Sequence, residues 1–157
     1  MTRRDFLRRL SRKEALQLIA PSQDIRDVYL KKSASRLESA RHLLSIEKFE
    51  ESTEMAYYSM YHSVMALFFA CGIKCENHTA ASWLLIDVFG IDNIALEAAR
   101  KERLDKEYYV PAAPVSPDVE ALIKTAETFN AVLLDKIERM TKEEIENYRA
   151  RFRKMLK

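Results

Sequence analysis

The stretch from Glu47 to Gly72 constrains the fold of this chain more than any other. It is predicted to be one helix, and its second half has few polar residues on any side. A helix that is apolar nearly all round is buried at the centre of a protein, and Gly72 supplies the left-handed residue that commonly ends a helix. We therefore expect other helices to enclose this one. Its large apolar residues are Phe49, Met55, Tyr58, Met60, Tyr61, Val64, Met65, Leu67, Phe68 and Phe69.

The scarcity of turn residues indicates which class of fold surrounds this helix. The 157 residues include only 2 glycines and 4 prolines, whereas a β-rich fold needs turn residues at short intervals. A composition that is 48% hydrophobic and 32% charged is ordinary for a globular protein of one domain. We predict an all-α protein, an antiparallel up-and-down helical bundle of about five core helices with extra terminal helices.

Hydrophobic periodicity and capping signals place the other helices. Ser22 caps a long first helix, Ser116 followed by Pro117 begins another, and Thr141 with Glu144 forms a capping box. The predicted helices cover residues 22–45, 80–89, 92–109 and 116–140, followed by a last amphipathic helix. Thr79 is expected to cap the helix over 80–89, with four side chains turned inward: Trp83, Leu84, Ile86 and Val88. We expect three parts: a basic extension over 1–20, a bundle over 21–140, and a C-terminal helix over 141–157 packed on it.

The N-terminal extension has two apolar patches, one around Leu7 and one around Leu16. We predict one or two short amphipathic helices between Thr2 and Ala20, with a capping box of Ser11 and Glu14 between them. Basic residues crowd both this extension and the end of the chain, although the formal net charge is only +2. Basic ends can attract phosphates, but we interpret these as solvated faces of terminal helices.

Several classes of protein are excluded by what the sequence lacks. No apolar run is long enough to span a bilayer, and the N-terminus has no secretory signal pattern, so we expect a cytoplasmic location with Cys71 and Cys75 as reduced thiols. Together with His78 these cysteines form C-x3-C-x2-H, but no fourth zinc ligand is evident. There is no phosphate-binding glycine loop and no nucleophile elbow. We predict neither a metal nor a cofactor.

The central helix also resembles a known family. The segment Ala56-Tyr57-Tyr58-Ser59-Met60-Tyr61-His62-Ser63, followed by an apolar run, a Gly-Ile and a later His-Thr, is similar to the second long helix of HEPN domains of the YYAMFHA type. The resemblance covers residues 24–139. It implies an all-α bundle, with a small nucleotidyltransferase as partner in a toxin–antitoxin-like two-gene module. It also implies binding of a nucleotide or RNA, with no role at a membrane. We expect a homodimer, because the central helix and the last amphipathic helix carry more large apolar residues than a monomer of this size is expected to cover.

Many HEPN proteins are ribonucleases, whose signature is an Arg followed after four to six residues by a His. The only match is Arg36 with His42, which lies in the first long helix, where the family does not place the motif. We interpret it as coincidence and favour a binding module over an enzyme. The alternatives are a divergent, metal-independent HEPN ribonuclease toxin, which needs His78 or His62 near Arg103, and a purely structural helical adaptor.

The resemblance implies a site for phosphate and base contacts. The family branch often has an Arg followed by Asp-Tyr at the end of the later helix, which Arg103, Asp105 and Tyr108 resemble apart from two inserted residues. If the resemblance holds, these residues converge with those of the central helix on one polar groove. The structural alternative makes the histidines hydrogen-bonded core residues and the tyrosines core or interface aromatics. The candidate nucleotide- or RNA-binding residues are Tyr58, His62, His78, Arg103, Asp105 and Tyr108.

Overall fold

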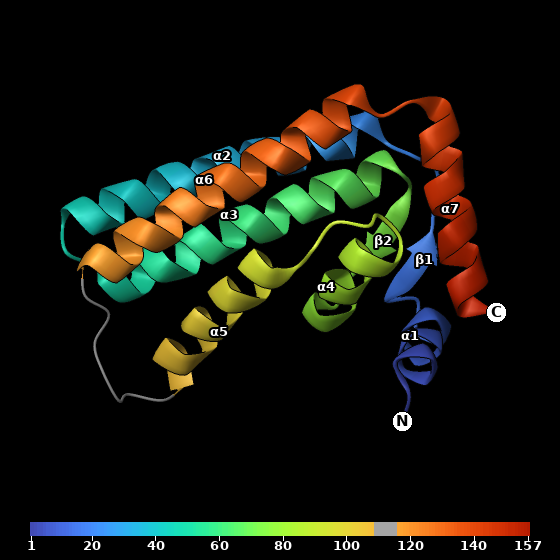
Figure 1. Ribbon diagram of the computed structural model, residues 1–157, viewed down its shortest axis with the longest axis horizontal. Helices are drawn as coiled ribbons and strands as arrows, with labels where there is room; N and C mark the ends of the chain where they lie inside the picture. Colours follow the sequence, from blue (N-terminus) through green and yellow to red (C-terminus); the bar gives the residue numbers. More distant parts are fainter. Residues whose placement is uncertain (109–115) are drawn as a thin grey trace.

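The computed structural model describes the backbone of residues 1–108 and 116–157 and the side chains of 1–104 and 116–157. Long helices run side by side and shorter elements gather at one end (Figure 1). In chain order the described elements are α1 (Arg3–Arg12), β1 (Leu16–Leu18), α2 (Gln23–Ser45), α3 (Phe49–Ala70), β2 (Ile73–Cys75), α4 (His78–Asp87), α5 (Ile94–Tyr108), α6 (Ser116–Arg139) and α7 (Lys142–Leu156). This architecture confirms the predicted all-α bundle.

The central helix α3 is enclosed as its composition predicts. It packs against α2, α6 and α5 (Figure 1), and its Met60, Val64 and Phe68 side chains are fully buried. The short connection between α2 and α3 holds them as a hairpin, with Glu47 in the left-handed region at φ 61°. Much of the apolar surface of α3 is therefore covered within one chain, while five of its large apolar residues stay only partly buried: Phe49, Met55, Tyr58, Tyr61 and Phe69.

A buried polar network joins the three longest helices. The Ser33 hydroxyl of α2 donates to the Ser59 carbonyl of α3 at 2.7 Å and lies 2.8 Å from the Ser63 hydroxyl. Ser63 in turn donates to the side-chain oxygen of Asn130 on α6 at 2.8 Å, and the Asn130 amide donates back to the Ser59 hydroxyl at 3.2 Å. Small hydroxyl residues let the helices approach closely while every buried hydroxyl finds a partner.

The prediction of a second N-terminal helix was wrong. Residues Leu16–Leu18 form β1, which pairs antiparallel with β2 and places Leu16 opposite Cys75. The proposed capping box of Ser11 and Glu14 is not formed, because α1 ends at Arg12 and Glu14 takes a left-handed φ of 59°. Residues 16–18 form a strand and not a helix for two reasons. The alternation of Leu16 with Gln17 buries Leu16 completely, and pairing with β2 satisfies the backbone hydrogen bonds of the segment.

Two details of α4 also differ from the prediction. The helix begins earlier, at His78, because the Asn77 side chain, not Thr79, accepts a hydrogen bond from the Ala80 amide at 2.9 Å. Ile86 points outward and is 41% exposed, whereas Leu84 and Val88 are buried as expected. The capping box of Thr141 and Glu144 at the start of α7 is confirmed.

Arg149 of α7 closes the end of the bundle where the chain turns at Gly72. Its Nη1 donates to the carbonyls of Ile19 at 2.7 Å, Cys71 at 2.9 Å and Gly72 at 3.2 Å. One guanidinium thus fastens the N-terminal segment, the end of α3 and α7 together. Gly72 has the positive φ of 69° that the sequence predicts for a helix-ending glycine. No helix within 1–108 or 116–157 has the length and apolar character needed to cross a membrane.

Candidate functional site

A cluster of aromatic and basic side chains lies where α3 meets the start of α4 and the end of α5. We call it the tyrosine–histidine cluster; its residues are Tyr57, Tyr58, Tyr61, His62, His78 and Arg103. Tyr57 and Tyr61 are one helical turn apart and share a ridge of α3, and Tyr58 and His62 form the adjacent ridge. The turn at Gly72 and the strand β2 bring His78, the first residue of α4, back beside these ridges.

His78 is held by two tyrosines. Its Nδ1 lies 2.6 Å from the Tyr57 hydroxyl, and its ring stacks on Tyr61 with centroids 4.0 Å apart and planes 5° apart. Burial raises the pKa of Tyr57 to about 12, so its hydroxyl keeps its proton. Burial, then Arg103 and Arg100, lower the pKa of His78 below its ordinary value. We assign a neutral His78 that accepts from Tyr57 at Nδ1 and carries its own proton on Nε2.

Arg103 reaches the cluster from α5. Its Nη1 donates to the Tyr58 hydroxyl at 2.8 Å. The guanidinium carbon lies 5.2 Å from the ring centroid of Tyr57 and 5.2 Å from that of Tyr58, within the range of a cation–π contact. One turn earlier, Arg100 donates from Nη2 to the Thr79 hydroxyl at 2.9 Å. Two arginines of α5 therefore place positive charge beside the first turn of α4.

His62 lies at the margin of the cluster, towards α2. Its ring centroid is 6.0 Å from that of Tyr58 and 5.7 Å from that of Tyr29, and its buried Nδ1 has no hydrogen-bond partner among the described residues. Burial, followed by the charges of Arg36 and Lys32, lowers the pKa of His62 to about 4. The ring is therefore neutral near pH 7, and it is half-buried beside Tyr29 and Tyr58.

Sequence reasoning named part of this cluster and missed the rest. The structure brings together Tyr58, His62, His78 and Arg103, whereas the side chains of Asp105 and Tyr108, in the last turn of α5, lie outside the described residues. Tyr57, Tyr61, Arg100 and Thr79 were not on the list of candidates. The spacing of Tyr57 and Tyr61 by four residues was the available signal, because it aligns both rings on one side of a helix.

The C-x3-C-x2-H pattern does not assemble into a ligand set. Cys71 and Cys75 are both buried free thiols, whose pKa values burial raises to about 12 and about 11. The Cys71 sulfur faces Met140 and that of Cys75 faces the Asn77 carbonyl, while His78 contacts tyrosines. Among the described residues, no group of three or more His, Cys, Asp or Glu side chains is arranged to hold a metal ion.

Comparison with known proteins agrees with this geometry. A model of the HEPN domain matches residues 27–147 of the chain. The protein belongs to the HEPN family. No curated protein matches the chain. The HEPN match begins within α2, includes the whole tyrosine–histidine cluster, and ends in the first half of α7.

Several elements of this HEPN protein lie outside the matched region. These are α1, β1 and the part of α7 that follows residue 147. All three are at the right of Figure 1, away from the end of the bundle where α2 turns into α3. Arg149, which fastens that end of the molecule, is therefore also an addition to the HEPN region.

Proposed function

We propose that this HEPN protein binds a nucleotide or RNA at the tyrosine–histidine cluster. One observation carries the proposal: the Arg103 guanidinium contacts both Tyr57 and Tyr58 while His78 stacks on Tyr61 beside it. A cation beside aromatic rings is a combination that binds single-stranded nucleic acids, since phosphates need positive charge and bases need flat surfaces. Tyr58 and Tyr61 are half-buried and can offer such surfaces, whereas Tyr57 is fully buried and holds His78. The neutral Nε2–H of His78 adds a hydrogen-bond donor.

The protonation states favour binding over catalysis. Cleavage of RNA by proton transfer needs one group that takes a proton and another that gives one near neutral pH. The pKa values of His62 and His78 are both lowered, so both rings are neutral at pH 7. Burial raises the pKa values of Tyr57 and Tyr61, so neither hydroxyl gives up its proton readily near neutral pH. The described cluster therefore contains a base but no matching acid.

Binding of a short single-stranded RNA, ATP and GTP to the purified protein tests this proposal. We expect saturable binding that weakens as salt rises, and a loss of about 10-fold in affinity for Arg103→Gln, because one phosphate or base contact is worth about 1–3 kcal/mol. Lys101→Gln is the matched control, since it removes one charge from an exposed side chain of the same helix. An equal loss in both variants would show that only overall charge matters, and no binding at all would remove the proposal.

One observation favours a second candidate function, a divergent ribonuclease. Arg103 and His78 both contact Tyr57, so a base and a cation that can stabilise a phosphorane lie close together. The test is incubation of the purified protein with RNA in the presence of a chelator. Robust cleavage that is abolished by His78→Ala would replace the binding proposal with this one.

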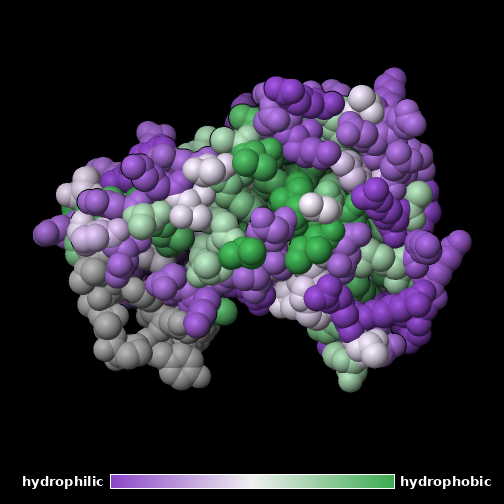
Figure 2. Space-filling view, viewed as in Figure 1, coloured by the Kyte–Doolittle hydropathy of each residue, from purple (hydrophilic) through white to green (hydrophobic). Residues whose placement is uncertain are grey.

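We further propose that the protein works as a homodimer with a small nucleotidyltransferase partner in a toxin–antitoxin-like module. The family resemblance motivates the nucleotidyltransferase partner. Apolar surface remains for the dimer, because Phe49 and Phe69 on α3 are only partly buried and Val28 on α2 and Val132 on α6 are 49% and 54% exposed. Figure 2 also shows apolar side chains gathered in the middle of one face. Light scattering of the purified protein, alone and after co-expression with a candidate partner, tests these assemblies.

A further inference from the structure

A cleft opens between α1, α4 and α7, separate from the tyrosine–histidine cluster. It has a volume of about 480 Å³ and is lined by Arg3, Arg4, Leu7, Asp87, Arg151, Lys154 and Met155. We call it the terminal cleft. Hydrophilic side chains dominate the surface over α1 and α7 (Figure 2). The basic residues at the two ends of the sequence thus line one cavity, although the sequence analysis interpreted them as independently solvated.

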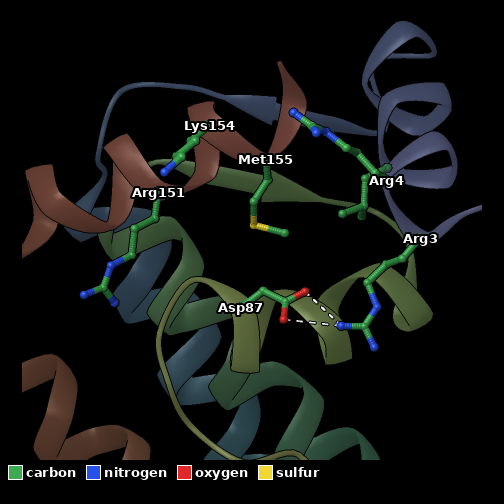
Figure 3. A pocket seen from close by; sticks show the side chains of 7 residues that line it. Arg3, Arg4, Asp87, Arg151, Lys154 and Met155 are labelled. Carbon is green, nitrogen blue, oxygen red and sulfur yellow. Dashed lines mark hydrogen bonds and ion pairs between the residues drawn. The ribbon is translucent and has the colours of Figure 1, made fainter.

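The charges of the terminal cleft are unbalanced. Four cationic residues and one carboxylate line it, and that carboxylate is already engaged, because Arg3 Nη1 lies 3.0 Å from Asp87 Oδ2 (Figure 3). Arg151 donates to the Val88 carbonyl at 3.0 Å and so keeps its full charge. Within the described residues, neither Arg4 nor Lys154 has an ion-pair or hydrogen-bond partner for its side chain. These two charges are available for an anion.

The centre of the cleft is apolar. The Met155 side chain extends into the space between Asp87 and Lys154 (Figure 3), and Leu7 is 1% exposed at the base of the cleft. The walls are held in place, because Arg8 of α1 donates to the Leu156 carbonyl of α7 at 3.4 Å and also contacts the Lys157 carbonyl. A preformed cavity of this size with an apolar centre and a few polar groups is typical of a small-molecule site.

We propose that the terminal cleft binds a phosphate ester of nucleotide size. Arg4 and Lys154 would contact the phosphates, and the base or another apolar body would lie against Met155 and Leu7. Such a ligand matches both the basic rim and the apolar centre of the cleft. Arg and Lys are the side chains that recognise phosphate, whereas an inorganic anion alone would leave the apolar centre uncovered. Apart from Asp87, the residues that line the site lie outside the HEPN match, and the site stands independently of the tyrosine–histidine cluster.

The single tryptophan of the chain gives a readout that is specific to this cleft. Trp83 on α4 lies under the Arg3 guanidinium, whose central carbon is 4.9 Å from the ring centroid. A phosphate that draws Arg3 away from Asp87 changes the surroundings of this ring. Ligand bound at the tyrosine–histidine cluster does not contact Trp83. Tryptophan emission therefore distinguishes the two sites.

The experiment is a calorimetric titration with ADP, pyrophosphate and a short single-stranded RNA, with Trp83 emission followed in parallel. We expect ADP to bind saturably, more tightly than pyrophosphate, and to change the emission of Trp83. In Arg4→Gln/Lys154→Gln the affinity for ADP should fall at least about 10-fold, the loss of one good charged contact. Lys48→Gln/Lys142→Gln removes the same charge from exposed lysines elsewhere and should leave it unchanged.

Each other result overturns the proposal or part of it. Absence of ADP heat, or equal losses in both double variants, shows that no phosphate-ester site exists in the cleft. If pyrophosphate binds as tightly as ADP, the apolar part of the ligand does not contribute to binding. If RNA binds and ADP does not, the cleft contacts a nucleic-acid backbone and is not a small-molecule site. Arg103→Gln should retain ADP binding with the Trp83 response, so failure of the cluster and failure of the cleft are distinguishable.

Discussion

The two glycines of the chain permit a controlled test of how Arg149 stabilises the fold. Gly72 and Gly90 have nearly the same positive φ, 69° and 68°. A Cβ added at Gly90 would meet nothing within 4 Å, whereas a Cβ at Gly72 would lie 2.3 Å from both the Arg149 Nη1 and the Ile19 carbonyl oxygen. Alanine at either position therefore causes the same backbone strain, but only at Gly72 does it also displace Arg149.

The magnitudes follow from this difference. Gly90→Ala should lower the free energy of unfolding by about 1 kcal/mol, the cost of a left-handed residue with a side chain. Gly72→Ala should cost about 4 kcal/mol, because hydrogen bonds to a charged group are worth about 1.5–3 kcal/mol each and the three bonds of Arg149 cannot all survive. For a chain of this size the melting temperature should fall by about 3 °C and about 10 °C, respectively.

The assay is equilibrium urea unfolding followed by far-ultraviolet circular dichroism, with the slope m checked for constancy. A double-mutant cycle with Arg149→Ala completes it. Once Arg149 is gone, Gly72→Ala meets one obstacle fewer, so the combined loss should be smaller than the sum by at least about 1 kcal/mol. Equal losses at the two glycines, or strict additivity with Arg149→Ala, would refute the reasoning.

Three further predictions concern other parts of the structure. The pKa of His62 is lowered from 6.5 to about 4 in the folded protein, so the unfolded chain binds more protons than the folded chain between these pH values. The contribution of His62 to the free energy of unfolding should therefore be complete above pH 6.5 and decline towards about pH 4. His62→Gln should remove that part of the pH dependence, as measured by urea unfolding at several pH values, whereas an unchanged profile would show that carboxylates cause it. Asn130→Ala should lower the free energy of unfolding by about 1–3 kcal/mol, because the buried hydroxyls of Ser59 and Ser63 lose a partner. The control is Thr128→Ala, at an exposed position of the same helix, which should cost less than about 0.5 kcal/mol. Similar losses in the two variants would contradict a stabilising role for the network. Thr141→Ala should lower stability by about 1 kcal/mol by removing the capping box of α7, and a neutral effect on the melting temperature would show that packing alone holds this helix.

The bundle could be predicted from the sequence because its signals are local. The all-round apolar character of α3, the capping residues Ser22 and Thr141, and the glycine at position 72 each depend on neighbours within a few residues. The ribbon of β1 and β2 could not be predicted in this way. Residues 16–18 take strand form because of a partner more than fifty positions later, and periodicity in a three-residue segment does not reveal such a partner.

The candidate site could also be predicted only where its signals are local or belong to the family pattern. Tyr58 and His62 were found through a local motif, and His78 and Arg103 were named through the family resemblance. The hydrogen bond between Tyr57 and His78 depends on the path of the chain through β2, and the terminal cleft depends on docking of α1 against α7. Basic residues at the two ends of a sequence do not indicate by themselves that they line one cavity.

The reach of Arg149 also sets an order of assembly during synthesis. The hairpin of α2 and α3 has partners close in sequence and can form as soon as both helices have been made. The hydrogen bond to the Ile19 carbonyl, in contrast, can form only after Arg149, 130 positions later, has been made. The segment before α2 can pair through β1 with β2 as soon as residue 76 has been made, but Arg149 fastens it only after α7 has formed. A chain arrested before α7 would hold most of the HEPN region but lack Arg151, Lys154 and Met155, so the terminal cleft distinguishes molecules that have formed α7 from those that have not.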